Sequence, residues 1–336
     1  MSDKIKLAIA LGSTCSGCDI AILDIDEKIL DLSAIADIVY WPTAADPKIK
    51  DVEAMEDGEI TVALMHGTIR TSEHEHIAKL MRKKSVVLVA FGSCTCDGGI
   101  PALCNLTTKD EIFDVAYDRT LTTVNPEGTR PQEKTAVNGH ELTLPKLYDT
   151  GRALNQVVDV DYYVPGCPPA VPLIEQLLGI VVNFVKTGEL PPKGAVVASA
   201  KTVCDECELE KEEKTVDEIK RVHEITPDPK KCLMEQGLIC MGPVTRGGCG
   251  TQCINALMPC RGCMGAPEKV DDQGVKMISA LASVLGVSNE TDMTRKELEE
   301  LMKTVPDPIG TFYRFTLPMA TINKSLKGKK RETGGD

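Results

Sequence analysis

Aromatic residues and positive charge are both in short supply in this chain of 336 residues. Trp, Tyr and Phe together make up 4% of it, and 38 Lys and Arg stand against 50 Asp and Glu. The net charge of −12 argues against general nucleic-acid binding, which depends on a basic surface. The hydrophobic share of 42% is ordinary for a globular protein, and the length allows two domains with real cores.

Long apolar runs are missing as well. No stretch approaches the roughly 18 uninterrupted apolar residues that indicate a membrane-spanning helix. The apolar run at residues 5–11 is too short for a secretory signal. We therefore expect a cytoplasmic protein that binds neither membrane nor nucleic acid. Cysteines in the cytoplasm more often belong to metal or redox sites than to structural disulfides, and this chain has 14 of them.

Strand and helix patterns alternate through the first half of the chain. Short apolar runs predict strands at residues 4–11, 38–40, 60–65, 86–91 and 161–164, and helical spacing predicts helices at 19–32, 72–83 and 170–187. This alternation predicts an α/β fold with a parallel sheet wrapped by helices. The polar sequence at 105–160 predicts an insertion with a hairpin turn at Asn138-Gly139.

A Gly- and Pro-rich linker at 188–194 predicts two domains, residues 1–190 and 195–336. Between residues 200 and 268 the second domain shows little helical or strand period and many Cys, Gly and Pro. Metal ligation can supply the folding free energy that such a segment lacks. Residues 270–286 predict an amphipathic helix, and a capping box that begins at Thr294 predicts one more.

Four cysteines occupy Gly- or Pro-rich turns that follow predicted strands: Cys15, Cys18, Cys94 and Cys167. Because ligand sites lie at the carboxyl ends of parallel strands, we expect these turns to converge on one edge of the sheet. The Cys-x2-Cys spacing lets both sulfurs of the first turn face one centre, and a cubane iron–sulfur cluster takes four thiolates. A redox Cys-x-x-Cys pair with two buried free thiols is the alternative.

Eight more cysteines crowd into the second domain, and their spacing divides them into two sets of four. One set is Cys204, Cys207, Cys232 and Cys240, and the other is Cys249, Cys253, Cys260 and Cys263. Taken alone, either set could be a structural zinc site with four thiolate ligands. A redox role explains why three four-cysteine centres should be adjacent, so we favour iron. Cys96 and Cys104 are left over, and we interpret Cys96 as a spare buried thiol.

The cysteine motifs resemble a known family. The turns Gly12-x-x-Cys15-x-x-Cys18, Gly92-Ser93-Cys94 and Pro165-Gly166-Cys167-Pro168-Pro169 are similar to those in the electron-transfer small subunit of [NiFe] hydrogenases. A related cluster-bearing subunit of respiratory complex I shares these turns but not the later cysteines. The segment from Leu238 to Cys249 looks most like the cytoplasmic F420-non-reducing type of methanogens.

The resemblance implies a flavodoxin-like first domain and a small, irregular cluster-binding second domain. It also assigns three [4Fe–4S] clusters, and we name the cysteine sets after them: the proximal set is Cys15, Cys18, Cys94 and Cys167, the medial set is Cys249, Cys253, Cys260 and Cys263, and the distal set is Cys204, Cys207, Cys232 and Cys240. Electrons from hydrogen would leave through a small delta-type iron–sulfur subunit for heterodisulfide reductase. The nickel–iron centre lies in the large partner subunit, so we expect no catalytic residue in this chain.

Four positions depart from patterns seen in this family. Membrane-bound relatives have a His where this chain has Cys204, and many relatives have a three-iron medial cluster where Cys253 offers a fourth ligand here. Oxygen-tolerant relatives carry extra cysteines at the positions of Gly17 and Gly99, so the resemblance implies an oxygen-sensitive protein. The alternatives are the small subunit of a sulfhydrogenase or of an NAD- or F420-reducing hydrogenase, and a zinc-stabilised scaffold.

Overall fold

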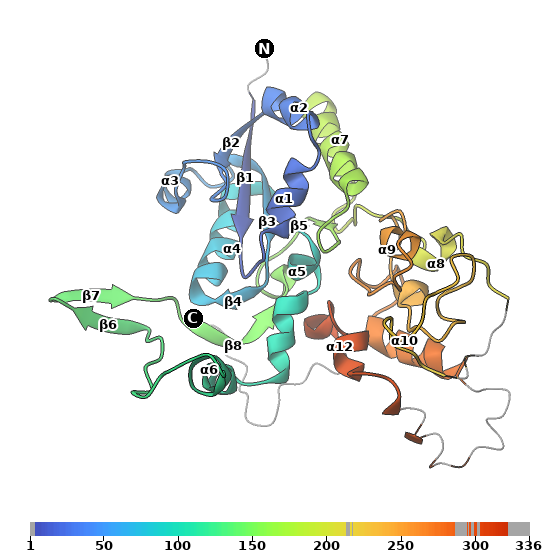
Figure 1. Cartoon of the computed structure of the whole chain (residues 1–336). Helices are drawn as coiled ribbons and strands as arrows, with labels where there is room; N and C mark the ends of the chain where they lie inside the picture. The colour runs from blue at the N-terminus through green and yellow to red at the C-terminus, as the bar shows by residue number, and fades with distance from the viewer. Residues whose placement is uncertain are drawn as a thin grey trace.

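A five-stranded parallel sheet forms the centre of the computed structural model, which describes residues 4–212, 216, 218–285, 294, 296, 299–300 and 303–321 (Figure 1). The strands are β1 (Ile5–Leu11), β2 (Ala36–Tyr40), β3 (Ile60–His66), β5 (Ser85–Phe91) and β9 (Tyr162–Val164). Their spatial order is β2-β1-β3-β5-β9. This is the 2-1-3-4-5 order of flavodoxin-like sheets, and it confirms the predicted α/β fold class.

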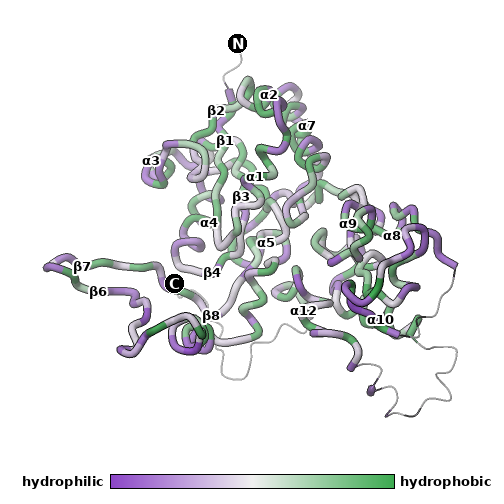
Figure 2. The backbone as a smooth tube through the Cα atoms, viewed as in Figure 1, coloured by the Kyte–Doolittle hydropathy of each residue, from purple (hydrophilic) through white to green (hydrophobic). Residues whose placement is uncertain are grey.

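Helices cover both faces of the sheet. They are α1 (Gly17–Leu23), α2 (Lys28–Ile35), α3 (Ile49–Ala54), α4 (Ser72–Lys84) and α7 (Val171–Thr187). Successive side chains of a strand point to opposite faces. Leu7 and Ile9 of β1 therefore pack with α1, α2 and α7, whereas Ala8 and Ala10 pack with α3 and α4. The covering helices alternate hydrophobic and hydrophilic residues along their length, as half-buried helices do (Figure 2).

The predicted strands and helices of the first half are confirmed to within two residues, with one exception. The helix predicted at 19–32 is two helices, α1 and α2, because Asp26 between them adopts a left-handed backbone with φ +53°. A right-handed helix cannot continue through that conformation. The N-cap of α1 is Ser16, and Asp19 lies buried in the first turn of the helix.

The segment between β5 and β9 contains most of the remaining structure of the first half. Its elements are α5 (Ser93–Cys96), η1 (Ile100–Leu106), α6 (Lys109–Phe113), η2 (Asp114–Arg119), β6 (Lys134–Val137), β7 (His140–Thr143), β8 (Leu147–Arg152) and η3 (Leu154–Gln156). The predicted hairpin is confirmed: β6 and β7 pair across Asn138 and Gly139, which both have positive φ. The hairpin projects from the body, while β8 pairs with β4 (Ile69–Thr71) (Figure 1).

The chain after the linker builds a mostly irregular region with its own core. Its short elements are α8 (Val203–Glu206), η4 (Gly242–Val244), α9 (Gln252–Asn255), α10 (Gln273–Ala282), α12 (Pro308–Phe312) and η6 (Leu317–Met319). Leu238, Met277 and Phe312 pack there around Cys240 and Cys260. The helix predicted at 270–286 is confirmed as α10, and the one predicted after Thr294 falls largely outside the described residues. None of the described helices combines the length and apolar character that spanning a bilayer requires.

Candidate functional site

The proximal set lies at the carboxyl edge of the sheet. Cys15 and Cys18 follow β1, Cys94 follows β5 and Cys167 follows β9. Burial, and then the charges of Cys94, Cys167 and Cys15, raise the pKa of the Cys18 thiol above its usual range. The structure therefore brings all four sulfurs within electrostatic reach of one another. Four thiolates at one partly buried place repel one another. A positively charged centre is therefore needed to hold them ionised.

Two glycines with positive φ keep space open beside the proximal sulfurs. A Cβ on Gly92 (φ +86°) would lie 2.6 Å from Cys18 Sγ. A Cβ on Gly99 (φ +63°) would lie 2.6 Å from Cys94 Sγ. In this structure a Cβ at either position would collide with a sulfur unless that sulfur moved, so glycine keeps the space for the cysteines open.

A buried polar network supports the first cysteine turn. Trp41 Nε1 donates a hydrogen bond to Asp19 Oδ1 at 2.7 Å, and His66 Nε2 lies 3.1 Å from the same oxygen. His66 Nδ1 lies 3.3 Å from the hydroxyl of Thr14, which precedes Cys15. Burial opposes ionisation of Asp19, but hydrogen bonds from His66 and Trp41 hold its pKa below the usual value. The sequence did not predict this network. His66 is the last residue of β3 and Asp19 lies in the first turn of α1, so the fold brings together two residues that are far apart in the chain.

The medial set lines one cavity of about 470 Å³. All four of its cysteines border this space, together with the proximal Cys167 and apolar groups such as Met264 and Phe315. Burial raises the pKa of Cys263 to about 12, although its sulfur receives a hydrogen bond from the backbone of Cys167. The chemistry of this donor set fits a multi-iron cluster, because four soft thiolates surround a space with apolar walls.

The distal set gathers around Gly242. A Cβ on Gly242 would lie 3.0 Å from Cys204 Sγ and 3.5 Å from Cys240 Sγ, so these two sulfurs are neighbours. Burial, and then the charge of Cys240, raise the pKa of Cys204 to about 12, and Cys232 and Cys207 act in the same direction. The distal cysteines therefore share one electrostatic neighbourhood, like the proximal ones.

Direct contacts join the three sets in a row. Cys167 borders the medial cavity together with Cys263, and Ser93 Oγ donates to the carbonyl of Cys263, so the proximal and medial sets adjoin. The backbone N–H of Cys260 donates to Cys240 Sγ at 3.3 Å, which connects the medial and distal sets. The spatial order is therefore proximal, medial, distal, although the distal cysteines precede the medial ones along the chain.

The two left-over cysteines lie apart from this row. Cys96 is buried in the core beneath the sheet, where its Sγ lies 3.5 Å from the carbonyl of Ala90. Cys104 is half-buried beside Asn105. Across the residues that the structure describes, no group of three or more His, Cys, Asp or Glu side chains is arranged to hold a single metal ion.

Comparison with known proteins finds similarity over almost the whole chain. A family model described as NADH ubiquinone oxidoreductase, 20 Kd subunit, matches residues 15–181. The iron–sulfur subunit of the F420-non-reducing hydrogenase from Archaeoglobus profundus is 42% identical over 96% of this chain and 99% of its own length. The corresponding F420-non-reducing hydrogenase protein from Methanothermobacter marburgensis is 37% identical over 97% of this chain and 99% of its own.

The similarity to solved structures concerns the fold. A chain of the recombinant [NiFeSe] hydrogenase from Desulfovibrio vulgaris Hildenborough superposes with a TM-score of 0.51 at 15% identity. The match covers 80% of this chain and 96% of that one. It therefore extends beyond the flavodoxin-like sheet into the cysteine-rich region.

Proposed function

The chain belongs to the family of small subunits of F420-non-reducing [NiFe] hydrogenases, and from this we propose that its three cysteine sets hold three [4Fe–4S] clusters in series. It is the electron-transfer subunit of an oxidoreductase and has a large hydrogenase subunit as its partner. The observation that carries the proposal is the row in which Cys167 borders the medial cavity beside Cys263, and Cys260 donates to Cys240 Sγ.

When bound, the clusters would supply one-electron redox chemistry. The protein's part is to hold the sulfurs, to exclude water and to donate hydrogen bonds to them. The N–H group of Cys260 does the last of these for Cys240. Such a hydrogen bond stabilises the ionised sulfur. It would therefore raise the reduction potential of the cluster that this sulfur ligates.

Cys204 and Cys253 complete the ligand sets in this proposal. Cys204 lies beside Cys240 across Gly242, and Cys253 borders the medial cavity with the other three medial cysteines. Both placements support four thiolates at each of these centres. The fourth thiolate at each adds negative charge, which lowers the reduction potential of the centre.

We also propose the surroundings of the chain. The proximal set lies at the exposed edge of the sheet, with Cys15 and Cys167 exposed, so the large subunit would cover this edge. A small delta-type iron–sulfur subunit would take electrons at the distal set and pass them to heterodisulfide reductase, in the cytoplasm. The domain boundary would fall between residues 190 and 195. Mass spectrometry of subunits that co-purify under anaerobic conditions tests these partners, and the absence of a delta-type subunit would contradict the exit route.

Replacement of one medial cysteine tests the cluster assignment. In Cys253→Ser, the medial centre should become a three-iron centre with its own electron paramagnetic resonance signal, while the proximal and distal signals stay. Cys104→Ser is the matched control, because Cys104 is also partly exposed but belongs to no set. Unchanged spectra in Cys253→Ser would remove Cys253 from the ligands. A protein without iron signals, colourless and rich in zinc, would overturn the whole proposal.

A further inference from the structure

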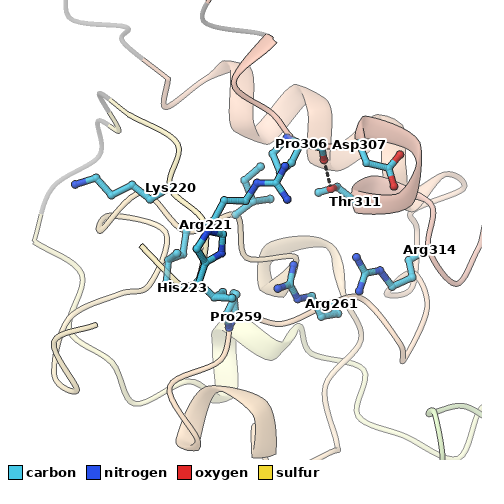
Figure 3. A pocket seen from close by; sticks show the side chains of 12 residues that line it. Lys220, Arg221, His223, Pro259, Arg261, Pro306, Asp307, Thr311 and Arg314 are labelled. Carbon is cyan, nitrogen blue, oxygen red and sulfur yellow. Dashed lines mark hydrogen bonds between the residues drawn. The ribbon is translucent and has the colours of Figure 1, made fainter. Parts of the chain in front are cut away.

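A second pocket, of about 240 Å³, opens in the C-terminal region and has no part in the proposed electron route (Figure 3). Three segments contribute to it: residues 220–223, the loop with Pro259 and Arg261, and residues 306–314. Leu238 and Ile239, which precede a distal cysteine, form part of its wall. The pocket is therefore built into the fold next to the cysteine sets rather than at a chain end.

The lining of this pocket is strongly basic. Among the described residues, it carries four cations, Lys220, Arg221, Arg261 and Arg314, against one carboxylate, that of Asp307. The Asp307 carboxylate accepts a hydrogen bond from the backbone N–H of Gly310 at 3.1 Å and so caps helix α12. Such a concentration of positive charge contrasts with the net charge of −12 for the whole chain.

Ion pairs with carboxylates are missing for the guanidinium groups in the pocket, as far as the described residues go. Lys220 pairs with Glu218 at 3.3 Å, but Arg221, Arg261 and Arg314 form no ion pair with any residue that the structure describes. Arg314 Nε donates to the carbonyl of Gly310 at 3.0 Å, which leaves its terminal nitrogens available. Figure 3 shows the Arg261 and Arg314 guanidinium groups directed toward one another across the pocket. Two like charges held so close repel unless an anion lies between them.

The proposed clusters do not account for all of this charge. Arg261 also lines the medial cavity, so the medial thiolates offset part of its charge. Arg221 and Arg314 do not line that cavity. Both therefore add positive charge to the basic pocket, where a bound anion would balance it.

We propose that this pocket binds a compact dianion of the phosphate class between Arg261 and Arg314, with Arg221 at the exposed rim. Guanidinium forks match the oxygens of phosphate in a bidentate manner. Two facing guanidinium groups with a third at the rim also suit a dianion better than a single carboxylate. Arg261 directly follows the medial Cys260, and the wall residue Ile239 directly precedes the distal Cys240, so the charge of the anion acts on both sets.

Anaerobic isothermal titration calorimetry of the purified complex with inorganic phosphate, at constant ionic strength, tests the proposal. Binding should be saturable at one site per chain. Arg314→Gln should weaken it at least about tenfold, because a hydrogen-bonded ionic contact is lost. Arg221→Gln should weaken it less, by about threefold, because the rim is exposed to solvent. Lys186→Gln, a change of the same charge at the exposed end of α7, should have no effect.

Several results would overturn the proposal. One is the absence of saturable heat in the wild-type complex. Another is unchanged phosphate affinity in both Arg314→Gln and Arg221→Gln. If acetate binds as tightly as phosphate, the pocket is a carboxylate site and not a dianion site. The visible spectrum of each variant reports whether it is folded. Should Arg314→Gln fail to fold, Arg221→Gln still tests the proposal, because Arg221 lies at the exposed rim.

Discussion

Sulfur atoms decide the behaviour of this protein at the scale of single residues. Burial raises the pKa of Cys94, Cys204 and Cys263 to about 12, so without a cation these thiols stay protonated at neutral pH. Metal binding requires thiolates and releases their protons. The surrounding structure is therefore not suited to reactive free thiols, and the proposed iron supplies the positive charge that the cysteine sets lack.

Cys94 and Cys96 differ in role although only one residue separates them. Cys94→Ser should lower electron transfer from hydrogen to a viologen dye by at least about tenfold, because it removes a proximal ligand. Cys96→Ser should leave this electron transfer nearly unchanged. The Cys96 side chain is buried in the core, and the hydroxyl of a serine there can still donate a hydrogen bond to the Ala90 carbonyl. Equal losses in the two variants would refute the ligand assignment.

Gly99 offers a test that leaves every cysteine in place. Gly99→Ala should strip the proximal centre of iron, because the new Cβ would lie 2.6 Å from Cys94 Sγ. Gly128→Ala is the control for positive φ alone, since Gly128 has φ +62° against +63° at Gly99 and no atom within 4 Å of its Cβ. Gly99 also has ψ −169°, a conformation nearly restricted to glycine, so Gly99→Ala adds backbone strain to the collision. Iron analysis should therefore separate them, and equal iron contents would show that the collision is harmless.

At the scale of elements, the strand ends position the cysteines and a few ion pairs hold the covering helices. Helix α4 is joined to strand β8 through Glu75 and Arg152, whose side chains lie 2.6 Å apart. Burial opposes the charge on Glu75, but hydrogen bonds from Lys79 and Arg152 lower its pKa to about 2. The folded carboxyl thus has a lower pKa than the unfolded one, so the pair stabilises the fold above pH 4.5 or so and loses this effect as the pH falls toward about 2.

Loss of Arg152 should therefore be costly over a defined pH range. Arg152→Gln should lower the free energy of unfolding by about 2–4 kcal/mol, because a mostly buried carboxylate loses its partner. Lys79→Gln removes the solvent-exposed partner of the same carboxylate and should cost less than about 1 kcal/mol. The difference in the free energy of unfolding between Arg152→Gln and Lys79→Gln, measured by chemical unfolding, should be the same at pH 7 and pH 5. A difference that already disappears at pH 5 would contradict the low pKa of Glu75.

The sequence predicted the elements of the first half well because each depends on local apolar spacing. It predicted neither the break between α1 and α2 nor the buried contact of Asp19 with His66 and Trp41. Both depend on backbone conformation and on contacts between distant segments, which spacing does not record. The sequence did not predict the basic pocket for the same reason, because its arginines come from three separate segments.

At the scale of the whole molecule, the flavodoxin-like sheet and the irregular region meet where the cysteine sets touch. The chain returns on itself in this region, since the distal cysteines come first in sequence but last in space. Spacing in the sequence divided the eight later cysteines into two sets, and the medial four do border one cavity. Their spatial order needed the folded structure, because it is set by contacts between Cys167, Cys263, Cys260 and Cys240.

Native mass spectrometry of the chain, released from its complex without oxygen, tests the central claim most directly. Three cubane clusters predict added mass equal to about twelve iron and about twelve sulfide ions. A value of about eleven iron ions would keep the three centres but remove Cys253 as a ligand. Zinc in place of iron and sulfide, or cysteines joined pairwise as disulfides, would contradict the account.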